Sequence, residues 1–383
     1  MKQNIRTKTC RVCGNRFYEE PVLTFDNMPK AAQYLPDVES LNEDWGVHIG
    51  IFQCSCCGLV QLDSAPVPYY KEVIRASAFS AEMQEFRRIQ FTEFVQKYHL
   101  KYKKIIEIGC GHGEYLTIMQ QCGVSAYGLE YGDDSVKYCI RNGLKVSKGF
   151  VHNSHQNLRN AKFDAFFIMN FLEHLPDPNS FLKGIAYNLV DGGIGLVEVP
   201  NFDMIIRNQL FSEFIPDHLF YFTKDTLCTT LHQNGFDILN CEEIWHDYII
   251  SAIVKKRDKL NLDQFAETQT NLKNKLDVYI GRFPDKKVAI WGAGHQALSI
   301  ISQLQLSGKI QYVIDSAIFK QGKFTPVTHI PIVSPDTLNS NPVDAVIVMT
   351  AGYSDEVVSI IHKQYNKHKL SIATLKGSIL EIC

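Results

Sequence analysis

Residues 105–115 read IIEIGCGHGEY, an apolar run that ends in Glu107 and continues into three glycines at alternate positions. A second apolar run, residues 124–129, ends in another acid, Glu130. Glycines let the backbone approach a ligand closely because they carry no Cβ atom. An acid at the tip of the next strand can accept hydrogen bonds from both ribose hydroxyls, as in dinucleotide-binding folds. The two runs therefore predict a parallel α/β sheet that holds an adenosyl ligand at its carboxyl edge.

The spacing of the glycines narrows the identity of that ligand. Gly109, Gly111 and Gly113 follow Gly-x-Gly-x-Gly rather than Gly-x-Gly-x-x-Gly, and no Gly-Lys-Ser/Thr follows, which argues against a triphosphate loop. Glu107 would repel a pyrophosphate but suits a cationic ligand such as S-adenosylmethionine (SAM), which carries a sulfonium and an ammonium group. Here the sequence resembles class I methyltransferases, whose first and second motifs lie at these positions. The alternative is a structural βα turn in another α/β protein.

The composition sets the size and class of the protein. A chain of 383 residues is expected to hold two or three domains, and 45% hydrophobic residues are enough for real cores. A formal net charge of −2 provides no broad basic field for a nucleic acid. No stretch approaches the ~20 apolar residues of a membrane span, and the N-terminal MKQNIR lacks the apolar centre of a secretion signal. We therefore expect a cytoplasmic protein with neither a nucleic-acid nor a membrane partner.

Four of the eleven cysteines form two CxxC pairs, Cys10 with Cys13 and Cys54 with Cys57. Two such knuckles are the usual way in which proteins bind tetrahedral zinc. Four thiolates leave no open coordination position, so we expect a structural rather than a catalytic zinc. Cys56 is an alternative ligand, and a redox dithiol pair or packed core thiols are the competing interpretations.

The chain is predicted to fold in consecutive parts. Residues 1–68 form the cysteine module. Residues 69–256 form the middle domain, which begins with a leading helix over residues 69–100. A polar connector over residues 257–284 leads to a smaller α/β domain over residues 285–383.

Strands and helices are expected to alternate along the middle domain. Strands are predicted at 104–108, 124–129, 144–148, 163–169 and 194–199, with helices at 114–122, 134–142 and 179–189 and a closing hairpin from 236–244 and 248–254. A class I methyltransferase sheet ends in such an antiparallel hairpin. The fold class is therefore α/β: a class I methyltransferase (Rossmann-like) central domain, preceded by the zinc module and followed by a smaller Rossmann-like α/β domain.

The last domain contains a second glycine turn, Gly292-x-Gly294-x-x-Ala297, with Asp315 at the end of the next strand. Taken alone, this pattern indicates an NAD site. The domain shows only about three strand signals rather than six, however, and a lone fingerprint of this kind is weak evidence. We prefer a helix N-terminus that receives a substrate's phosphates, or a turn that serves only packing.

Candidate catalytic residues follow the fourth and fifth strands of the middle domain. Asn170 stands where the fourth strand ends, and His174 follows four residues later. The segment after the fifth strand contains Asp217 and His218 among aromatic residues, and a histidine beside an acid is a good general base because its ordinary pKa is ~6.5. No Asn/Asp-Pro-Pro-aromatic motif occurs at Asn170, which argues against a nucleobase nitrogen as the target. For each histidine the alternative is a purely structural role.

Taken together, these residues resemble the sugar C-methyltransferases that act on nucleotide-linked 4-keto-6-deoxyhexoses. The resemblance covers nearly the whole chain. Its motifs are the four cysteines with Cys57-Gly58-Leu59-Val60-Gln61, Asn170-Phe171-Leu172-Glu173-His174, Asp217-His218, Trp291-Gly292-Ala293-Gly294 and the stretch 315–335.

The resemblance implies a mechanism. The ketone of the sugar acidifies the hydrogen on the neighbouring carbon, His218 of the acid–histidine pair removes that proton, and the enolate attacks the methyl group of SAM. Asn170 and His174 would steady the sugar oxygens or the enolate, His174 as a hydrogen-bond donor. SAM would lie over the glycines and beside Glu107, with Asn170 near it, Glu130 on its ribose and Phe150 or Val151 near its adenine. The nucleotide-linked sugar is expected between the middle and last domains.

Three departures from that family leave the sugar and the acceptor atom open. The pair is Asp217-His218 here rather than Glu-His, and Ile215 replaces a tyrosine two residues before the acid. A tyrosine of the family's linker is missing as well, since Ile74 or Arg75 occupies its place, although Tyr69 and Tyr70 lie just upstream.

Three other functions remain open on the sequence. One is an O- or N-methyltransferase of a small metabolite or sugar on the same scaffold. A second is an RNA or protein methyltransferase with the zinc module as a reader, but no basic patch or stacking platform is visible. A third is a protein that binds NAD or a sugar nucleotide with a vestigial middle domain. The sequence does not separate a monomer from a dimer.

Overall fold

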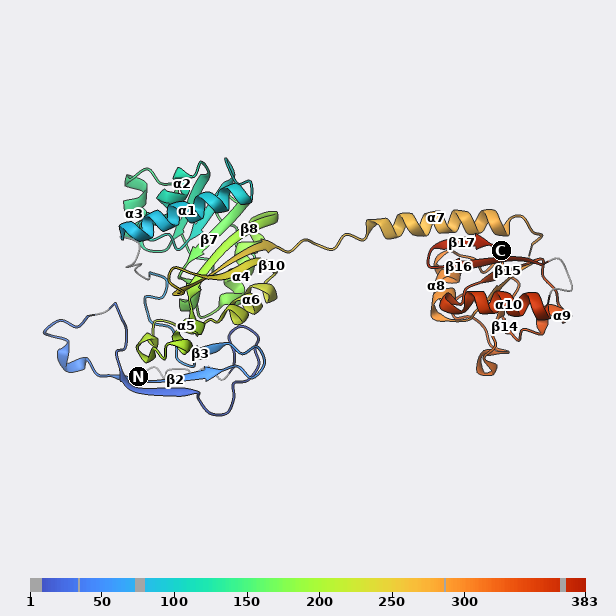
Figure 1. Cartoon of the computed structure of the whole chain (residues 1–383), viewed down its shortest axis with the longest axis horizontal. Coiled ribbons are helices and arrows are strands. Elements are labelled where there is room, and N and C mark those ends of the chain that lie inside the picture. Colours follow the sequence, from blue (N-terminus) through green and yellow to red (C-terminus); the bar gives the residue numbers. More distant parts are fainter. Residues whose placement is uncertain (1–8, 34, 73–79, 286, 366–369) are drawn as a thin grey trace. The chain divides into compact units, whose positions relative to one another are not determined.

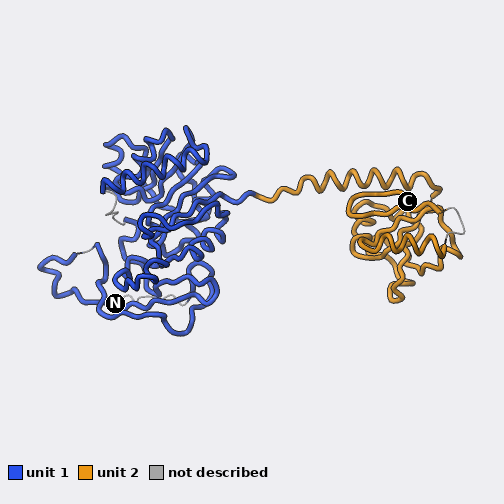
Figure 2. The backbone as a smooth tube through the Cα atoms, viewed as in Figure 1, with its two compact units in different colours: residues 1–258 blue, residues 259–383 orange. Residues whose placement is uncertain are grey.

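A computed structural model describes residues 9–33, 35–72, 80–285, 287–365 and 370–383. These residues form two compact units, 1–258 and 259–383, which Figure 2 shows in separate colours. Each unit has its own hydrophobic clusters and is described by itself. Ile74 and Arg75 of the linker lie outside the described residues.

The centre of the first unit is a sheet of seven described strands in the order β6-β5-β4-β7-β8-β11-β10. Strands β7, β8 and β10 of this sheet are labelled in Figure 1. Its members are β4 (Lys104–Ile108), β5 (Ser125–Glu130), β6 (Val146–Lys148), β7 (Phe163–Met169), β8 (Leu189–Pro200), β10 (Phe236–Ile244) and β11 (Ile249–Lys256). Strands β6 to β8 are parallel, and β11 and β10 close the sheet as an antiparallel hairpin. This is the class I methyltransferase arrangement that the sequence predicts, with the carboxyl ends of β4, β5, β7 and β8 at one edge.

Helices cover both faces of this sheet. The described helices of this unit are α1 (Ala81–Lys97), α2 (Glu114–Gln121), α3 (Asp133–Arg141), α4 (Pro178–Tyr187), α5 (Phe202–Arg207) and α6 (Lys224–Gln233), with short 3-10 turns at Leu41–Glu43, Leu172–His174 and Phe211–Glu213. Of these helices, α5 packs with the N-terminal strands. Buried side chains of α1, α2 and α3 pack on one face, and those of α4 and α6 pack on the other. Helices α2 and α3 follow β4 and β5 directly, so both begin at the edge of the sheet where the glycine turn lies.

The start of β8 differs from the sequence prediction. The strand was expected to begin at residue 194, but it begins at Leu189 and runs through Gly192 and Gly193. The register between β7 and β8 shifts between Phe163 and Ala165, which accommodates the glycine pair as an irregularity inside the strand.

The N-terminal segment forms its own antiparallel sheet, whose four described strands are β1 (Leu23–Met28), β2 (Val47–Gln53), β3 (Val60–Leu62) and β9 (Phe220–Tyr221). The strand β9 comes from the middle of the chain, directly after His218. Val60 pairs with Tyr221, and Gln61 pairs with Phe220. The cysteine module and the segment that carries His218 are thus parts of one sheet.

The second unit begins with α7 (Asp263–Ile280) and continues as an α/β fold. Its sheet, counted over the described residues, has six strands in the order β14-β13-β12-β15-β16-β17. These are β12 (Val288–Trp291), β13 (Val313–Ile314), β14 (Ile332–Val333), β15 (Ala345–Val348), β16 (Ser371–Lys376) and β17 (Ile379–Ile382), with helices α8 (His295–Gln303), α9 (Thr337–Ser340) and α10 (Ser354–Gln364). The expectation of about three strands was wrong. Strands β13 and β14 have two residues each, which is too short for a recognisable alternation of apolar and polar residues.

Among the described helices, none combines the length and the apolar character that a membrane-spanning segment requires.

Candidate functional site

The glycine turn between β4 and α2 depends on its glycines. Gly109, Gly111 and Gly113 have φ values of 73°, 54° and 82°, which favour glycine over any residue with a Cβ. A Cβ at Gly109 would lie 3.2 Å from the ring of Phe171, and a Cβ at Gly113 would lie 2.3 Å from Cδ1 of Leu144. The turn therefore keeps its shape and its open backbone only with glycine at these positions.

Glu130 lies at the end of β5 and faces this turn. One carboxylate oxygen accepts a hydrogen bond from the amide of Gly111 at 2.8 Å, and the other accepts one from the amide of Gly132, also at 2.8 Å. A carboxylate has about four acceptor positions, so both oxygens can still accept bonds from ribose hydroxyls. The backbone thus holds the acid beside the turn, in the place that the sequence assigns to a ribose.

Asn170 follows β7 with a φ of 49°, and its amide donates to the carbonyl of Glu198 at 2.9 Å. Its side-chain oxygen is buried and, over the residues that the structure describes, has no hydrogen-bond partner. A buried acceptor left unpaired costs about 1–3 kcal/mol, which a ligand with a hydrogen-bond donor would recover. Asn170 is thus a ready acceptor at the carboxyl edge of the sheet.

An aromatic wall follows β6. The ring of Phe150 makes edge contacts with Tyr70, Tyr131 and Phe171 at centroid distances of 6.1 to 6.4 Å, and the next residue, Val151, is buried. Such a wall offers an apolar surface next to the position of Glu130.

These groups fit SAM. Glu107, which is fully buried on β4, supplies a negative charge, the glycine turn supplies open backbone, Glu130 supplies ribose acceptors, and Asn170 supplies an acceptor for an ammonium group. The roles of Phe150 and Val151 toward adenine remain predictions.

Two histidines meet beside this edge. His174 ends a short 3-10 turn, and its ring lies edge-on to the ring of His218, with centroids 4.8 Å apart and planes 71° apart. Nδ1 of His174 lies 2.7 Å from the backbone carbonyl of Asp217. Because a carbonyl only accepts, we assign the proton to Nδ1, and Nε2 of the neutral ring is then an acceptor.

Burial keeps both histidines neutral at ordinary pH. Loss of solvent lowers the pKa of His174 to about 4. Burial, with a smaller contribution from neighbouring His174, lowers the pKa of His218 to about 3. Both rings therefore carry free nitrogen lone pairs in the absence of substrate.

The carboxylate of Asp217 points away from His218. It accepts a hydrogen bond from the hydroxyl of Tyr69 at 2.6 Å and another from the amide of Ala32 at 3.0 Å. Within the described part of the chain, no hydrogen bond or ion pair joins this carboxylate to either histidine ring. The expected acid–histidine pair is thus adjacent in sequence, but the acid holds the backbone that orients His174.

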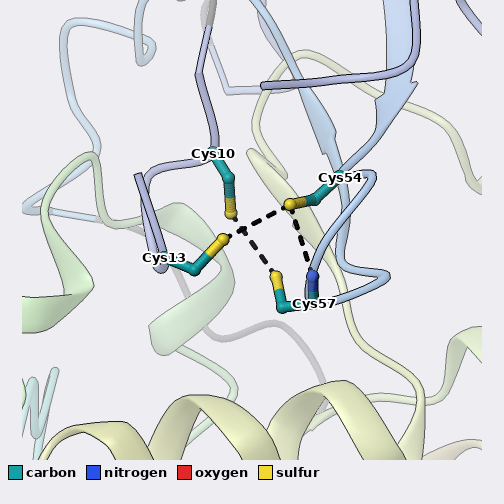
Figure 3. Close-up of side chains that lie close together, drawn as sticks. All are labelled: Cys10, Cys13, Cys54 and Cys57. Carbon is teal, nitrogen blue, oxygen red and sulfur yellow. Dashed lines mark hydrogen bonds between the residues drawn. The ribbon is translucent and has the colours of Figure 1, made fainter. Parts of the chain in front are cut away.

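The four cysteines of the N-terminal module converge on one point from two loops (Figure 3). The sulfurs of Cys10 and Cys57 lie 3.7 Å apart, and those of Cys13 and Cys54 lie 3.4 Å apart. Tetrahedral zinc with Zn–S bonds of about 2.3 Å requires sulfur separations of about 3.8 Å, so the set fits this ion. Cys56 is exposed and is not a member of the group.

A further set of possible metal ligands coincides with the histidine pair. One ligand atom each from Glu173, His174 and His218 lies within 4.8 Å of the others. The sequence prediction did not include Glu173 or Tyr69. Glu173 stands inside the Asn170–His174 motif, and Tyr69 stands near the missing linker tyrosine. Both positions therefore drew attention in the sequence, but the sequence did not show which residues they contact.

In the second unit, the acid beside the glycine turn already accepts hydrogen bonds from the protein itself. Asp315 accepts hydrogen bonds from the amides of Ala293 and Ala317, both at 2.9 Å, and from Nζ of Lys320 at 2.8 Å. A Cβ on Gly292 would lie 2.7 Å from the carbonyl oxygen of Met349. The lysine neutralises the acid that NAD would need for its ribose, and close packing alone explains Gly292.

Two family models match the chain. One describes a methyltransferase domain and covers residues 81–240. The other describes a C-methyltransferase C-terminal domain and covers residues 254–372. We therefore identify the chain as a SAM-dependent C-methyltransferase. The expected enzyme class and methyl donor are thereby confirmed.

Three known proteins illustrate what this C-methyltransferase is similar to. The chain is similar to the C-methyltransferase NovU of Streptomyces niveus, with 21% identity over 385 aligned positions and 91% of each chain covered. It is also similar to the ubiquinone biosynthesis O-methyltransferase of Aeromonas salmonicida (strain A449), with 26% identity over 141 positions, 33% of this chain and 59% of that protein. A solved SAM-dependent methyltransferase from Clostridium acetobutylicum ATCC 824 is 14% identical, covers 49% of this chain and 96% of its own, and has a TM-score of 0.38.

Proposed function

We propose that this C-methyltransferase methylates the carbon next to the ketone of a nucleotide-linked keto-deoxysugar, after His218 has removed a proton from that carbon. The observation that carries the proposal is a pair of neutral histidines, His174 buried and His218 partly exposed, beside an unpaired amide oxygen at the carboxyl edge of the SAM sheet. The match to the C-methyltransferase NovU along most of both chains supports carbon as the acceptor. The sequence resemblance to the sugar C-methyltransferases supports the ketosugar.

His218 acts as the base. Among the described residues, no side chain forms a hydrogen bond with its ring nitrogens. Its lowered pKa keeps a lone pair available at neutral pH. The proton leaves the sugar carbon for an imidazole nitrogen, and the electron pair of the broken C–H bond is delocalised onto the carbonyl oxygen. A positioned general base of this kind contributes roughly 10²- to 10⁴-fold to a rate.

His174 and Asn170 orient the sugar. The expected donor role of His174 does not suit its geometry, because the Nδ1 proton is bound to the carbonyl of Asp217 and Nε2 is an acceptor. His174 therefore accepts from a sugar hydroxyl, and the amide nitrogen of Asn170 is the group that can donate to the enolate oxygen. The oxygen of the same amide faces the methyl donor.

SAM, when bound, supplies a methyl group on a positively charged sulfur, and its C–S bond breaks as the new C–C bond forms. The chain's part is to align the two reactants, since positioning accounts for much of the rate of such a transfer. The four thiolates hold zinc as a structural ion outside this chemistry.

The test is a comparison of His218→Ala with His155→Ala, a change at an exposed histidine outside the site. Substrates are thymidine-, uridine- and guanosine-diphosphate-linked 4-keto-6-deoxyhexoses, assayed for methyl transfer and, with S-adenosylhomocysteine present, for solvent-deuterium exchange at the carbon next to the ketone. We expect His218→Ala to bind SAM normally but to lose both activities by at least ~100-fold. Turnover close to normal in His218→Ala, or methylation at oxygen without exchange, would refute the proposal.

A further inference from the structure

Tyr69 makes a buried contact with the candidate site, and none of the proposed catalytic steps requires this contact. The residue lies between β3 and α1, with only 7% of its surface exposed. Its hydroxyl donates to the carboxylate of Asp217 at 2.6 Å. A charge-assisted bond of this length between buried groups is among the stronger polar contacts in a protein.

The same hydroxyl and carboxylate also tie down the loop between β1 and β2. The amide of Gln33 donates to the hydroxyl of Tyr69 at 3.1 Å, and the amide of Ala32 donates to the carboxylate of Asp217 at 3.0 Å. The Tyr69–Asp217 pair is therefore a joint between the cysteine module and the segment that carries the proposed base.

The backbone of that segment continues the connection to both histidines. The carbonyl of Asp217 accepts the proton on Nδ1 of His174, and His218 is the next residue. One residue further, Leu219 bonds through its amide to the carbonyl of Glu173 at 2.8 Å and through its carbonyl to the amide of Leu62 at 3.0 Å. A rotation of Asp217 would therefore move His218 and release the ring of His174 together.

We propose that Tyr69 is a positioning residue for the reaction: by holding the carboxylate of Asp217, it fixes the backbone carbonyl that orients His174 and the position of His218. The inference rests on the proposed function. It assigns Asp217 a role through the backbone, and it makes the cysteine module part of the support of the site.

The first experiment is Tyr69→Phe, which removes one hydroxyl and keeps the ring. We expect kcat to fall by about 10- to 100-fold, because small misplacements of reacting groups cost up to about 100-fold. The dissociation constant for SAM should stay unchanged, because the hydroxyl removed bonds to Asp217 and to the amide of Gln33. Tyr18→Phe in the cysteine module is the control for loss of a tyrosine hydroxyl, because the side chain of Tyr18 is 55% exposed.

A double-mutant cycle separates positioning from a general loss of stability. If Tyr69 acts through Asp217, the variant Tyr69→Phe/Asp217→Asn should have the same kcat as Asp217→Asn alone. Losses that multiply would overturn the inference, as would a normal kcat in Tyr69→Phe. Should Tyr69→Phe fail to fold, Asp217→Asn decides by itself, because a normal kcat there excludes any action through that carboxylate.

The outcome for His218→Ala distinguishes the two proposals. If His218→Ala is inactive and Tyr69→Phe is fully active, only the positioning role is refuted. If His218→Ala is active, the proposed function is refuted, and the positioning role with it.

Discussion

The substitution Gly109→Ala tests the central feature of the site, the glycine turn to which we assign the methyl donor. A side chain at a φ of 73° lowers the free energy of unfolding by roughly 1–2 kcal/mol, because a Cβ atom is sterically disfavoured in the left-handed region. The new Cβ would also lie 3.2 Å from the ring of buried Phe171, which must move by a few tenths of an ångström, and mild overpacking of this kind costs about 1 kcal/mol more. Phe171 is the neighbour of Asn170, so its displacement reaches the acceptor that faces SAM.

Gly143→Ala is the matched control, because Gly143 has a φ of 77° but a Cβ there meets nothing within 4 Å. Urea unfolding should show a loss of about 1–2 kcal/mol in the control and about 2–3 kcal/mol in Gly109→Ala. Calorimetric titration with SAM should show an unchanged dissociation constant in the control and a rise of at least ~10-fold in Gly109→Ala, which is ~1.4 kcal/mol of binding free energy. Equal SAM affinity in the two variants would refute the assignment of this turn to the methyl donor.

Three further predictions address the charges and the metal. Burial lowers the pKa of His174 to about 4, so below pH ~6.5 the unfolded state binds a proton that the folded state does not bind. The free energy of unfolding should therefore fall by up to ~3 kcal/mol from pH 6.5 to 4. Urea unfolding should show that this free energy depends less steeply on pH in His174→Gln, and an identical dependence would contradict the assignment. Metal analysis should find one zinc per chain, lost in Cys13→Ser; a second equivalent that disappears in His218→Ala would show that the histidine pair and Glu173 bind a metal instead. Glu130→Gln should weaken SAM binding by about 10-fold in calorimetry, since the ribose loses a charged acceptor, and an unchanged affinity would remove Glu130 from the site.

The central sheet was readable from the sequence because its signals are local. Strands β4 and β7 have the predicted bounds, and the hairpin of β10 and β11 follows two apolar runs. The glycine turn and Glu130 could be placed together because the carboxyl ends of neighbouring parallel strands meet at one edge. Fold, enzyme class and methyl donor all depend on this one local pattern.

The leading helix shows where local signals fail. On α1, the apolar side chain of Ile89 is 47% exposed, whereas the charged side chain of Arg87 is fully buried. The guanidinium of Arg87 forms an ion pair with Glu198, whose backbone carbonyl accepts the amide of Asn170. A charged residue on a helix is ordinarily assigned to solvent, so only the tertiary partner reveals that this one belongs to the interior.

The role of Asp217 was equally hidden, for a different reason. Sequence adjacency suggests that an acid and the following histidine act as a pair, yet Asp217 lies in a turn, in which the amide of His218 donates to the carbonyl of Ile215. Directly after this segment, β9 joins the sheet of the cysteine module through only two residues, too few to give a periodic signal. The carboxylate of Asp217 bonds to Tyr69 and to the amide of Ala32, so the cysteine module and the proposed base are linked through one short stretch of backbone. Any change that loosens the module, including loss of its metal, should therefore lower turnover before it lowers affinity for SAM.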